Sequence, residues 1–387
     1  MDLVRAGIAL FLPFVTEVWQ VYVLIFLLQS ASAAFTPTFQ ATIPDVLPEE
    51  KDYTRALSLS RLAYDLENLL SPALAAALLT VIGFHWLFGG TVIGFLVSAA
   101  LVLTVTLPVP KRVEREGGVY DKTTRGLRIY LATPRLRGLL ALNLSVAAAG
   151  AMVIVNTVVI VRALLGRPDS DVAIALGCFG GGSMLAALLL PRALDERPDR
   201  SVMLPAAGLL GAVLLAFAGL LVGTAWFSAR TFTTVAVDWI WPALLATWAL
   251  LGTGYSAVQT PAGRLLRRSA QTEDRPALFA AQFALSHAAW LITYPLAGWL
   301  GAAAGIPITL GVLGGLTIIG LALAAWLWPA HDPEIVAHDH PELALNHPHL
   351  QGESGHGQRR GGPQHTHAFV IDDLHREWPS EAARPGA

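Results

Sequence analysis

Ten stretches of about twenty apolar residues follow one another along this chain of 387 residues. The hydrocarbon core of a bilayer is about 30 Å thick, and an α-helix needs about 20 residues to cross it. Hydrophobic residues make up 54% of the chain and charged residues only 14%, so a soluble fold of this size would lack the polar surface to cover itself. The sequence therefore predicts an all-α polytopic membrane protein, with spans near 5–20, 21–39, 62–83, 86–107, 136–163, 171–191, 202–223, 239–258, 277–301 and 306–328.

Basic residues divide the predicted loops into two sets. Eighteen lysines and arginines lie in the loops on one side of the spans, against three in the alternate loops. Basic loops stay in the cytoplasm, so we expect both termini inside a bacterial inner (cell) membrane. The eighteen are Lys51, Arg55, Arg61, Lys111, Arg112, Arg115, Lys122, Arg125, Arg128, Arg135, Arg137, Arg192, Arg197, Arg200, Arg264, Arg267, Arg268 and Arg275.

Two segments six spans apart carry the same features in the same order. A Thr-Pro pair at 36–37 and another at 260–261 each close an apolar span, and a polar loop, an arginine and a new helix follow. The two new helices carry Pro72 and Pro295 in mid-span. This parallel repeat predicts two six-helix bundles around a central cavity, which is the plan of a transporter.

This plan resembles the major facilitator superfamily, particularly its bacterial drug- and siderophore-exporter-like branch, over about residues 1–328. In the first half the resemblance rests on Phe-Thr-Pro at 35–37, Ile-Pro-Asp-Val-Leu-Pro-Glu-Glu at 43–50 and Arg-Ala-Leu-Ser at 55–58. In the second half, Leu-Asp-Glu-Arg-Pro-Asp-Arg at 194–200 is similar to the short basic loop of the family. The resemblance implies that Asp195, Arg197 and Arg200 latch helix ends in one access state; the alternative is a solvated basic turn.

The resemblance also implies a domain plan. The family has twelve transmembrane helices, and this chain supplies about ten, which places the missing pair before Met1. We expect an incomplete N-terminal bundle of four spans at 1–107, a cytoplasmic central loop at 108–135, a C-terminal six-helix bundle at 136–328 and a disordered, histidine-rich cytoplasmic tail at 329–387.

Few ionisable side chains lie within the predicted spans. A charged carboxylate at the centre of a membrane helix costs about 2.5–3.5 kcal/mol on insertion scales, so such groups face a cavity or a partner. Asp65 lies four residues after Arg61 and can pair with it on one helix face, whereas Glu67 has no such neighbour. We predict Glu67 as the proton- or cation-binding carboxylate, with Asp65, Asn68 and His287 as further transport or coupling residues. Structural roles stay open for Asp65, as an ion pair, and for His287, in packing.

The polar tail holds nine of the eleven histidines of the chain. Six of them form three His-x-His pairs, and in an extended segment residues two apart point to the same side. Neutral imidazole suits nickel, copper, zinc and cobalt, so each pair can offer two ligands to one ion. The candidate metal ligands are His331, His338, His340, His347, His349, His356, His365, His367 and His375. The apolar residues of 368–378 are expected to dock on the cytoplasmic face or on a partner.

An exporter of this superfamily with a long histidine-rich C-terminus resembles the bacterial nickel-resistance permeases. That resemblance implies efflux of nickel, with cobalt second, by proton-coupled alternating access, while the tail captures the metal. We expect no permanently bound cofactor, no enzymatic activity, no nucleic acid and a monomer whose partners are the lipid bilayer, protons and the transported ion or small molecule. Two alternatives stay open: an exporter of an organic drug or siderophore with an incidental or sensory tail, and a non-transporting membrane protein that buffers or senses metal.

Overall fold

The computed structural model describes residues 1–105, 118–231, 237–339, 357–359 and 362–379. Within these residues seven helices are long and apolar enough to cross a membrane, which confirms an all-α, multi-pass fold. They are α2 (Val18–Val46), α4 (Phe84–Thr104), α6 with the π-helix η2 (Pro134–Val158 and Val159–Leu164), α7 (Asp169–Glu196), α8 (Asp199–Thr231), α11 (Arg275–Ala303) and α12 (Ile306–Leu327).

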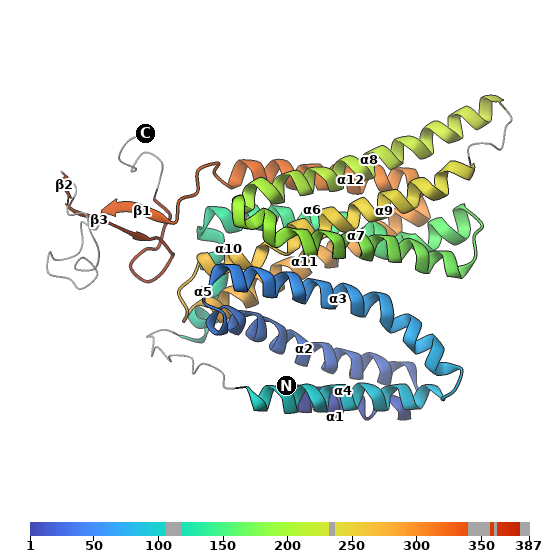
Figure 1. The fold of residues 1–387 in the computed structure, drawn as a ribbon, viewed down its shortest axis with the longest axis horizontal. Coiled ribbons are helices and arrows are strands. Elements are labelled where there is room, and N and C mark those ends of the chain that lie inside the picture. The colour runs from blue at the N-terminus through green and yellow to red at the C-terminus, as the bar shows by residue number, and fades with distance from the viewer. Residues whose placement is uncertain (106–117, 232–236, 340–356, 360–361, 380–387) are drawn as a thin grey trace.

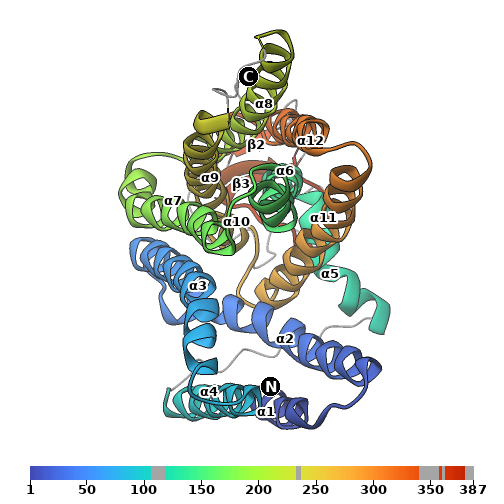
Figure 2. The same ribbon diagram turned by 90° about the vertical axis from the view of Figure 1, so that its right-hand side faces the viewer.

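The helices form two groups (Figures 1 and 2). The first group contains α1 (Asp2–Ala9), α2, α3 (Glu50–Leu79) and α4; the second contains α6 to α9, α11 and α12, with α9 spanning Val237–Gln259. Across the boundary α3 packs on α7, and α2 packs on α11. The buried core lies mainly in the second group, where α6 is enclosed by its neighbours.

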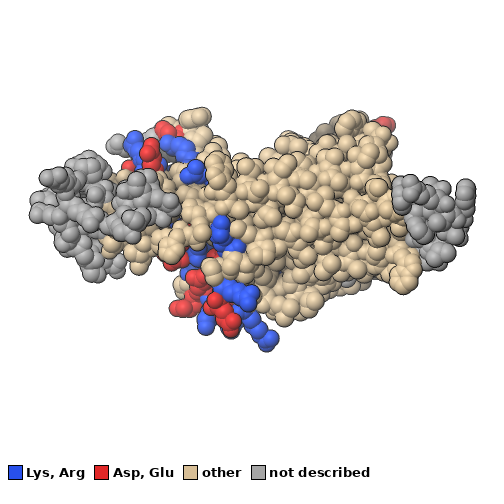
Figure 3. Space-filling model, turned by 90° about the horizontal axis from the view of Figure 1, so that it is seen from above, with Lys and Arg blue, Asp and Glu red and all other residues tan. Residues whose placement is uncertain are grey.

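One end of the bundle gathers the short elements and the charges. Helix α5 (Val119–Ala132), helix α10 (Ala262–Arg268) and a small sheet all lie there (Figure 1). In the face drawn in Figure 3, the Lys, Arg, Asp and Glu side chains also gather near this end, and the middle of the face is almost free of them. We call it the basic end. Residues 118–135 are the described part of the predicted central loop 108–135, and most of them form the helix α5.

The predicted span 5–20 is wrong. The chain there forms the eight-residue α1 and, after a break, a single 3-10 turn, η1 (Leu12–Phe14). Pro13 within that turn lacks the N–H that a continuing α-helix needs, and Glu17 and Gln20 form a capping box that starts α2. An eight-residue helix rises about 12 Å, which is too short to cross a bilayer.

The N-terminus lies beside α4, and its cytoplasmic position stays a prediction. The hydroxyl of Ser98, inside α4, donates to the Asp2 carboxylate at 2.8 Å. Met1 therefore lies within the length of α4, as Figure 1 shows, because α1 has too few residues to reach the basic end.

Helix α3 begins twelve residues before the predicted span 62–83. Its first turns are polar, and they extend the helix to Glu50 at the basic end. Arg61, predicted in a loop, therefore lies in the third to fourth turn of this helix. Hydropathy underestimated the length of this helix. Its polar side chains contact α7 and α10 instead of lipid, so they lower the hydropathy of the segment without ending the helix.

The described part of the tail is not disordered. Strands β1 (Ile335–Asp339), β2 (Gly357–Arg359) and β3 (Gly362–Ala368) form an antiparallel sheet in the order β1-β3-β2. The apolar side chains of Val336, Phe369 and Ile371 are buried and join the core of the bundle. The polar composition predicted no fold, but these few apolar residues bury themselves against the helices instead of against one another.

Helices α7 and α9 cross at two glycines. A Cβ atom on Gly182 would clash with the carbonyl oxygen of Ala249, and one on Gly252 with the carbonyl oxygen of Phe179. Small residues at such crossings let membrane helices approach closely. Of the glycines at 180–182 that the sequence places together, only Gly182 is in such contact, since a Cβ on Gly180 or Gly181 would meet open space.

We expect Gly182→Ala to lower the free energy of unfolding by about 1–3 kcal/mol, the usual cost of overpacking, because the backbones of α7 and α9 must separate. Gly181→Ala is the matched control and should leave stability unchanged or slightly improved, since alanine favours helix over glycine. The measurement is thermal unfolding of the purified protein in detergent. Equal melting temperatures for the two variants would contradict the described crossing.

Candidate functional site

Asp65 connects the two groups of helices. Its side chain is 4% exposed, and its carboxylate pairs with Arg61 at 2.7 Å on the same face of α3. The hydroxyl of Ser183 on α7 donates to the same carboxylate, and Nε of Arg61 donates to the Ser183 hydroxyl at 3.2 Å. Ser183 lies eight residues, or about 12 Å, from Pro191 near the basic end of α7. The predicted ion pair is thus present, and it lies between the two groups, well inside the span.

Aromatic side chains of the second group surround this ion pair. The guanidinium of Arg61 lies 4.7 Å from the ring centre of Tyr255, a cation–π contact. Tyr255 in turn packs edge-on against Phe179 at 5.6 Å and lies 6.3 Å from Trp290. Around Asp65, the interface between the groups therefore combines a compensated ion pair with a largely aromatic wall.

The other predicted coupling residues lie elsewhere. Glu67 and Asn68 are exposed on α3, and Glu67 lies on a different face from Asp65; the amide of Asn68 donates to the carbonyl of Tyr64 within its own helix at 2.9 Å. His287 is exposed on α11, where its ring stacks on Phe283 and its Nδ1 bonds to the carbonyl of that residue at 2.7 Å. The structure therefore does not bring Glu67, Asn68 and His287 together with Asp65.

Arg264 of α10 is the centre of an ion-pair network at the basic end. Its guanidinium pairs with Glu50 of α3 at 2.5 Å and with Asp199 of α8 at 2.9 Å, and it donates to the hydroxyl of Thr54 at 2.8 Å. Asp199 is fully buried and pairs also with Arg268 at 3.3 Å. Arg264 therefore links the first group of helices to a buried carboxylate of the second.

Two further contacts cross the same boundary. Arg275, the first residue of α11, pairs with Asp45 of α2 at 2.5 Å, and Arg267 donates to the carbonyl of Pro48. Both contacts lie at the basic end, beside the network of Arg264. We call the pairs Arg264–Glu50 and Arg275–Asp45 the basic-end latch, because they hold the ends of α3 and α2 against the second group.

In the segment 194–200, Asp199 and Arg200 form the contacts with other helices, whereas the sequence predicted such contacts for Asp195, Arg197 and Arg200. Arg200 donates to the carbonyls of Trp328 and Ala325 at 3.1 and 3.2 Å, and so binds the last turn of α12. Asp195 and Arg197 are exposed. The residue that sequence reasoning missed is Asp199, which is in the same segment and forms the buried ion pairs; the only signal for it was its place at the start of an apolar helix.

We expect the double variant Asp45→Asn, Glu50→Gln to weaken the latch. Each pair is partly exposed and worth about 1 kcal/mol, so the equilibrium should shift toward a state in which the two groups separate at the basic end. Spin labels on Lys51→Cys and Arg197→Cys, in a Cys178→Ser background, should show a longer and broader distance distribution. Asp52→Asn is the control, since it removes only the exposed pair with Arg55 within α3; an equal change there would contradict the latch.

Three histidines of the tail converge beside the sheet. His338 of β1 faces His365 of β3 in the backbone register, so His367, two residues further, lies diagonally across from it on the same face. His375 follows the sheet, and one ligand atom of each of His338, His367 and His375 lies within 4.8 Å of the other two. The ring centres are 4.7 to 5.1 Å apart.

In each of the three rings, the Nδ1 atom donates a hydrogen bond to an oxygen atom. Nδ1 of His338 donates to the carbonyl of Val336 at 3.0 Å, and Nδ1 of His367 to that of Ala368 at 2.8 Å. Nδ1 of His375 donates to the carboxylate of Asp372 at 2.8 Å. In a neutral imidazole the other nitrogen, Nε2, then carries the lone pair. This is the outer arrangement that metal-ligating histidines almost always show.

Asp372 and apolar side chains complete the surroundings of these rings. Burial raises the pKa of the Asp372 carboxyl, but hydrogen bonds from the ring and backbone of His375 and from the backbone of Leu374 outweigh it and bring this pKa to about 2. The ring of Phe369 lies 4.9 Å from that of His338 and 4.8 Å from that of His375. A set of three imidazoles, two buried and one half-buried, each with its Nδ1 bonded to an oxygen atom, is suited to a divalent transition metal.

The other predicted ligands have different outcomes. His331 is exposed before the sheet, and the backbone of His365 lies in β3. His340, His347, His349 and His356 lie outside the described residues. The three histidines that converge come from three separate parts of the tail, a combination that the His-x-His spacing did not indicate, and metal binding by each His-x-His pair stays a prediction.

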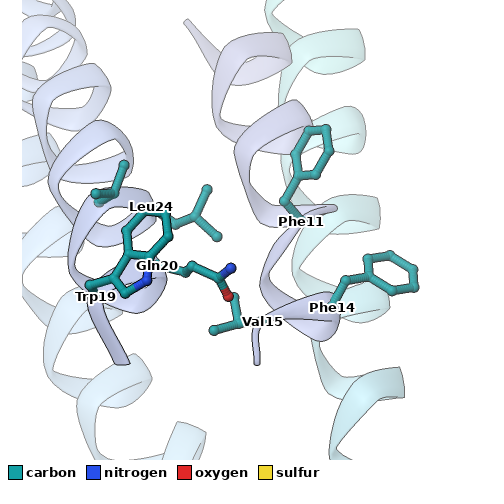
Figure 4. Close-up of a pocket in the computed structure, with 7 residues that line it drawn as sticks. Phe11, Phe14, Val15, Trp19, Gln20 and Leu24 are labelled. Carbon is teal, nitrogen blue, oxygen red and sulfur yellow. The ribbon is translucent and has the colours of Figure 1, made fainter. Parts of the chain in front are cut away.

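An apolar groove of about 270 Å³ lies far from these sites, between η1 and the start of α2 (Figure 4). Phe11 and Phe14 project from the α1–η1 side, and Trp19 and Leu24 from α2, with Gln20 between them. None of the residues that line this groove is ionisable.

Comparison with known proteins agrees with this architecture. A family profile described as Major Facilitator Superfamily matches residues 3–237. The search of curated proteins found no match. The matched region holds all of the first group of helices and α6 to α8 of the second. Since the match covers more than half of a chain with seven candidate membrane spans, the protein belongs to the Major Facilitator Superfamily and is a multi-pass membrane transporter.

Proposed function

We propose that this transporter exports a divalent transition metal, nickel first and cobalt second, from the cytoplasm of a bacterium. The observation that carries the proposal is the convergence of His338, His367 and His375 at the basic end of the bundle. Basic ends of membrane proteins face the cytoplasm, so these imidazoles are on the side from which an exporter takes its substrate. Neutral imidazole is a preferred ligand of both metals.

Alternating access in this proposal uses the two sets of contacts between the groups of helices. The basic-end latch closes the cytoplasmic entrance in the state described here. The Arg61–Asp65 pair with Ser183 lies further inside, and protonation of Asp65 would weaken its pair with Arg61 and its contact with α7. Proton entry from outside would then be exchanged for release of the metal, with Asp65 as the coupling carboxylate in place of Glu67.

Nickel accumulation in cells tests the proposed direction and substrate. Cells that express the full chain should hold less nickel than cells with an empty vector, and a protonophore should abolish the difference. The matched control is Asp65→Asn at the same expression level, which should accumulate nickel as the empty vector does. Equal nickel in energised cells with and without the chain would contradict metal export.

The aromatic interface favours a second candidate, export of an organic molecule such as a drug or siderophore. Phe179, Tyr255, Trp290 and Tyr294 form a continuous row of ring contacts beside a single ion pair. Such a wall suits a flat organic cation better than a dication, which needs several carboxylates to replace its water. Resistance to organic cations without any change in nickel accumulation would establish this alternative.

A further inference from the structure

We propose that His338, His367 and His375 form a fixed three-histidine metal site that fastens the C-terminal sheet to the basic end of the transporter. Metal binding at this site would then change the stability of the basic-end latch. Its fourth position would be taken by water or an anion. The site thus acts as a sensor rather than as a loose collector of ions. It rests on the proposed function only for the choice of nickel and cobalt as ions, since any divalent first-row metal with an affinity for imidazole fits the same ligands.

The ligand geometry supports a bound ion. The Nε2 atoms of His338 and His375 are 2.9 Å apart, and their Nδ1 atoms both donate to oxygen acceptors. These two nitrogens are hydrogen-bonded to one another, so one of the two rings carries a proton on Nε2, and a metal ion that replaces this proton would be bound by both lone pairs. Metal–nitrogen bonds of about 2.0–2.1 Å in a tetrahedral site separate the nitrogens by about 3.3 Å, so metal binding requires only small shifts of these rings.

The burial of the site favours a fixed role. His338 is 8% exposed and His375 is 4% exposed, and Phe369 and Trp378 cover the side near the bundle, with their ring centres 5.0 Å apart. An ion that must pass onward to a transport route exchanges more easily from exposed ligands. The structure therefore separates this site from the exposed His331.

Asp372 links the site to the helices. One carboxylate oxygen accepts from Nδ1 of His375, and the other accepts from the amide of Gln271 at 3.1 Å. Gln271 lies in the loop between α10 and α11, directly between Arg264 and Arg275, the two basic members of the latch. A metal bound to His375 would fix the position of Asp372, and through Gln271 that of this loop.

Ion pairs at both ends of the sheet hold the tail beside that loop. Asp373 pairs with Arg125 at 2.6 Å, and Arg125 also pairs with the buried Asp274 of the loop at 2.6 Å. At the other end of the sheet Glu334 pairs with Arg268, the partner of Asp199, at 3.2 Å. The residues that flank the sheet on its two sides therefore contact α10 and the α10–α11 loop, which are the elements beside the latch.

Metal binding to the purified full chain tests the site itself. Titration with Co²⁺ should give the absorption of a four-coordinate ion at one tight site, and Ni²⁺ should displace it. His375→Ala should abolish this site. His331→Ala, which replaces an exposed histidine of the same tail, should leave it unchanged. Asp372→Asn should weaken binding by 10–100-fold, as the loss of an outer-shell partner does. Equal effects of His331→Ala and His375→Ala, or a six-coordinate spectrum, would overturn the proposal.

Hydrogen exchange with and without Ni²⁺ tests the link to the latch. The metal should slow exchange in β1 and β3 and also in the loop 269–274, which contains no proposed ligand. In Gln271→Ala the strands should still be protected while the protection of the loop is lost. Protection confined to the strands in the unaltered chain would refute the link. Neither measurement uses transport, so a metal site in a protein that does not move nickel would refute the proposed function and leave this inference standing.

Discussion

Replacing Arg264 with methionine should lower the free energy of unfolding by about 3 kcal/mol, which is among the larger effects of any single substitution. The variant leaves the fully buried Asp199 carboxylate with Arg268, at 3.3 Å, as its ion-pair partner among the described residues, and it removes the contacts to Glu50 and Thr54. Burying an under-compensated charge costs more than the ion pair contributes. The measurement is the melting temperature of the detergent-solubilised protein.

Two variants serve as controls for Arg264→Met. Arg197→Met removes an exposed arginine at the same end and should leave the melting temperature almost unchanged. The double variant Asp199→Asn, Arg264→Met removes both charges and should recover part of the loss. A double variant as unstable as the sum of its two single changes would show that Arg264 acts through packing and not through its charge.

Replacing Asp65 with alanine should abolish transport and also destabilise the protein. It leaves the Arg61 guanidinium, only 13% exposed and between the two groups of helices, with the Ser183 hydroxyl as its remaining polar contact among those described above. An unpaired buried charge of this kind costs about 3–5 kcal/mol. Asp65→Asn keeps the shape and one acceptor for Ser183, so it should be more stable than the alanine variant while transport stays lost.

Glu67→Gln tests whether Glu67 or Asp65 is the coupling carboxylate of α3. Glu67 is exposed on another face of α3, so this variant should transport at nearly the normal rate. The readout is metal efflux from cells with matched amounts of protein in the membrane. Loss of efflux in Glu67→Gln with normal efflux in Asp65→Asn would reverse the assignment and restore the prediction made from sequence.

Hydropathy predicted the helices of the second group well. Their long apolar runs end at charged loops, and this leaves few residues at which each helix can begin or end. The predicted spans 171–191 and 306–328, for example, lie within or almost coincide with α7 and α12. It failed for the span 5–20, where Pro13 and the capping box at Glu17 break the run. It also failed at the start of α3, since polar side chains that pair with another helix are indistinguishable in sequence from those of a loop.

The sites were predicted less completely, because they depend on contacts between distant residues. The spacing of Arg61 and Asp65 predicted their ion pair, but the sequence contains no sign that Ser183, 118 residues later, would share it. The tail histidines indicated metal, yet the register that brings His338 opposite His365 is set by the sheet and not by the His-x-His spacing. Asp199 was missed since burial of a carboxylate at a helix start follows only from the position of α10.

Nickel transport by the purified full chain in proteoliposomes tests the central claim most directly. Vesicles in which the basic end faces outward, with an acidic interior, should take up nickel, detected by an internal metal-sensitive dye, and Asp65→Asn should not. Collapsing the proton gradient should stop the uptake. Uptake that is equal with and without the gradient, or equal for the chain and for Asp65→Asn, would contradict proton-coupled metal export.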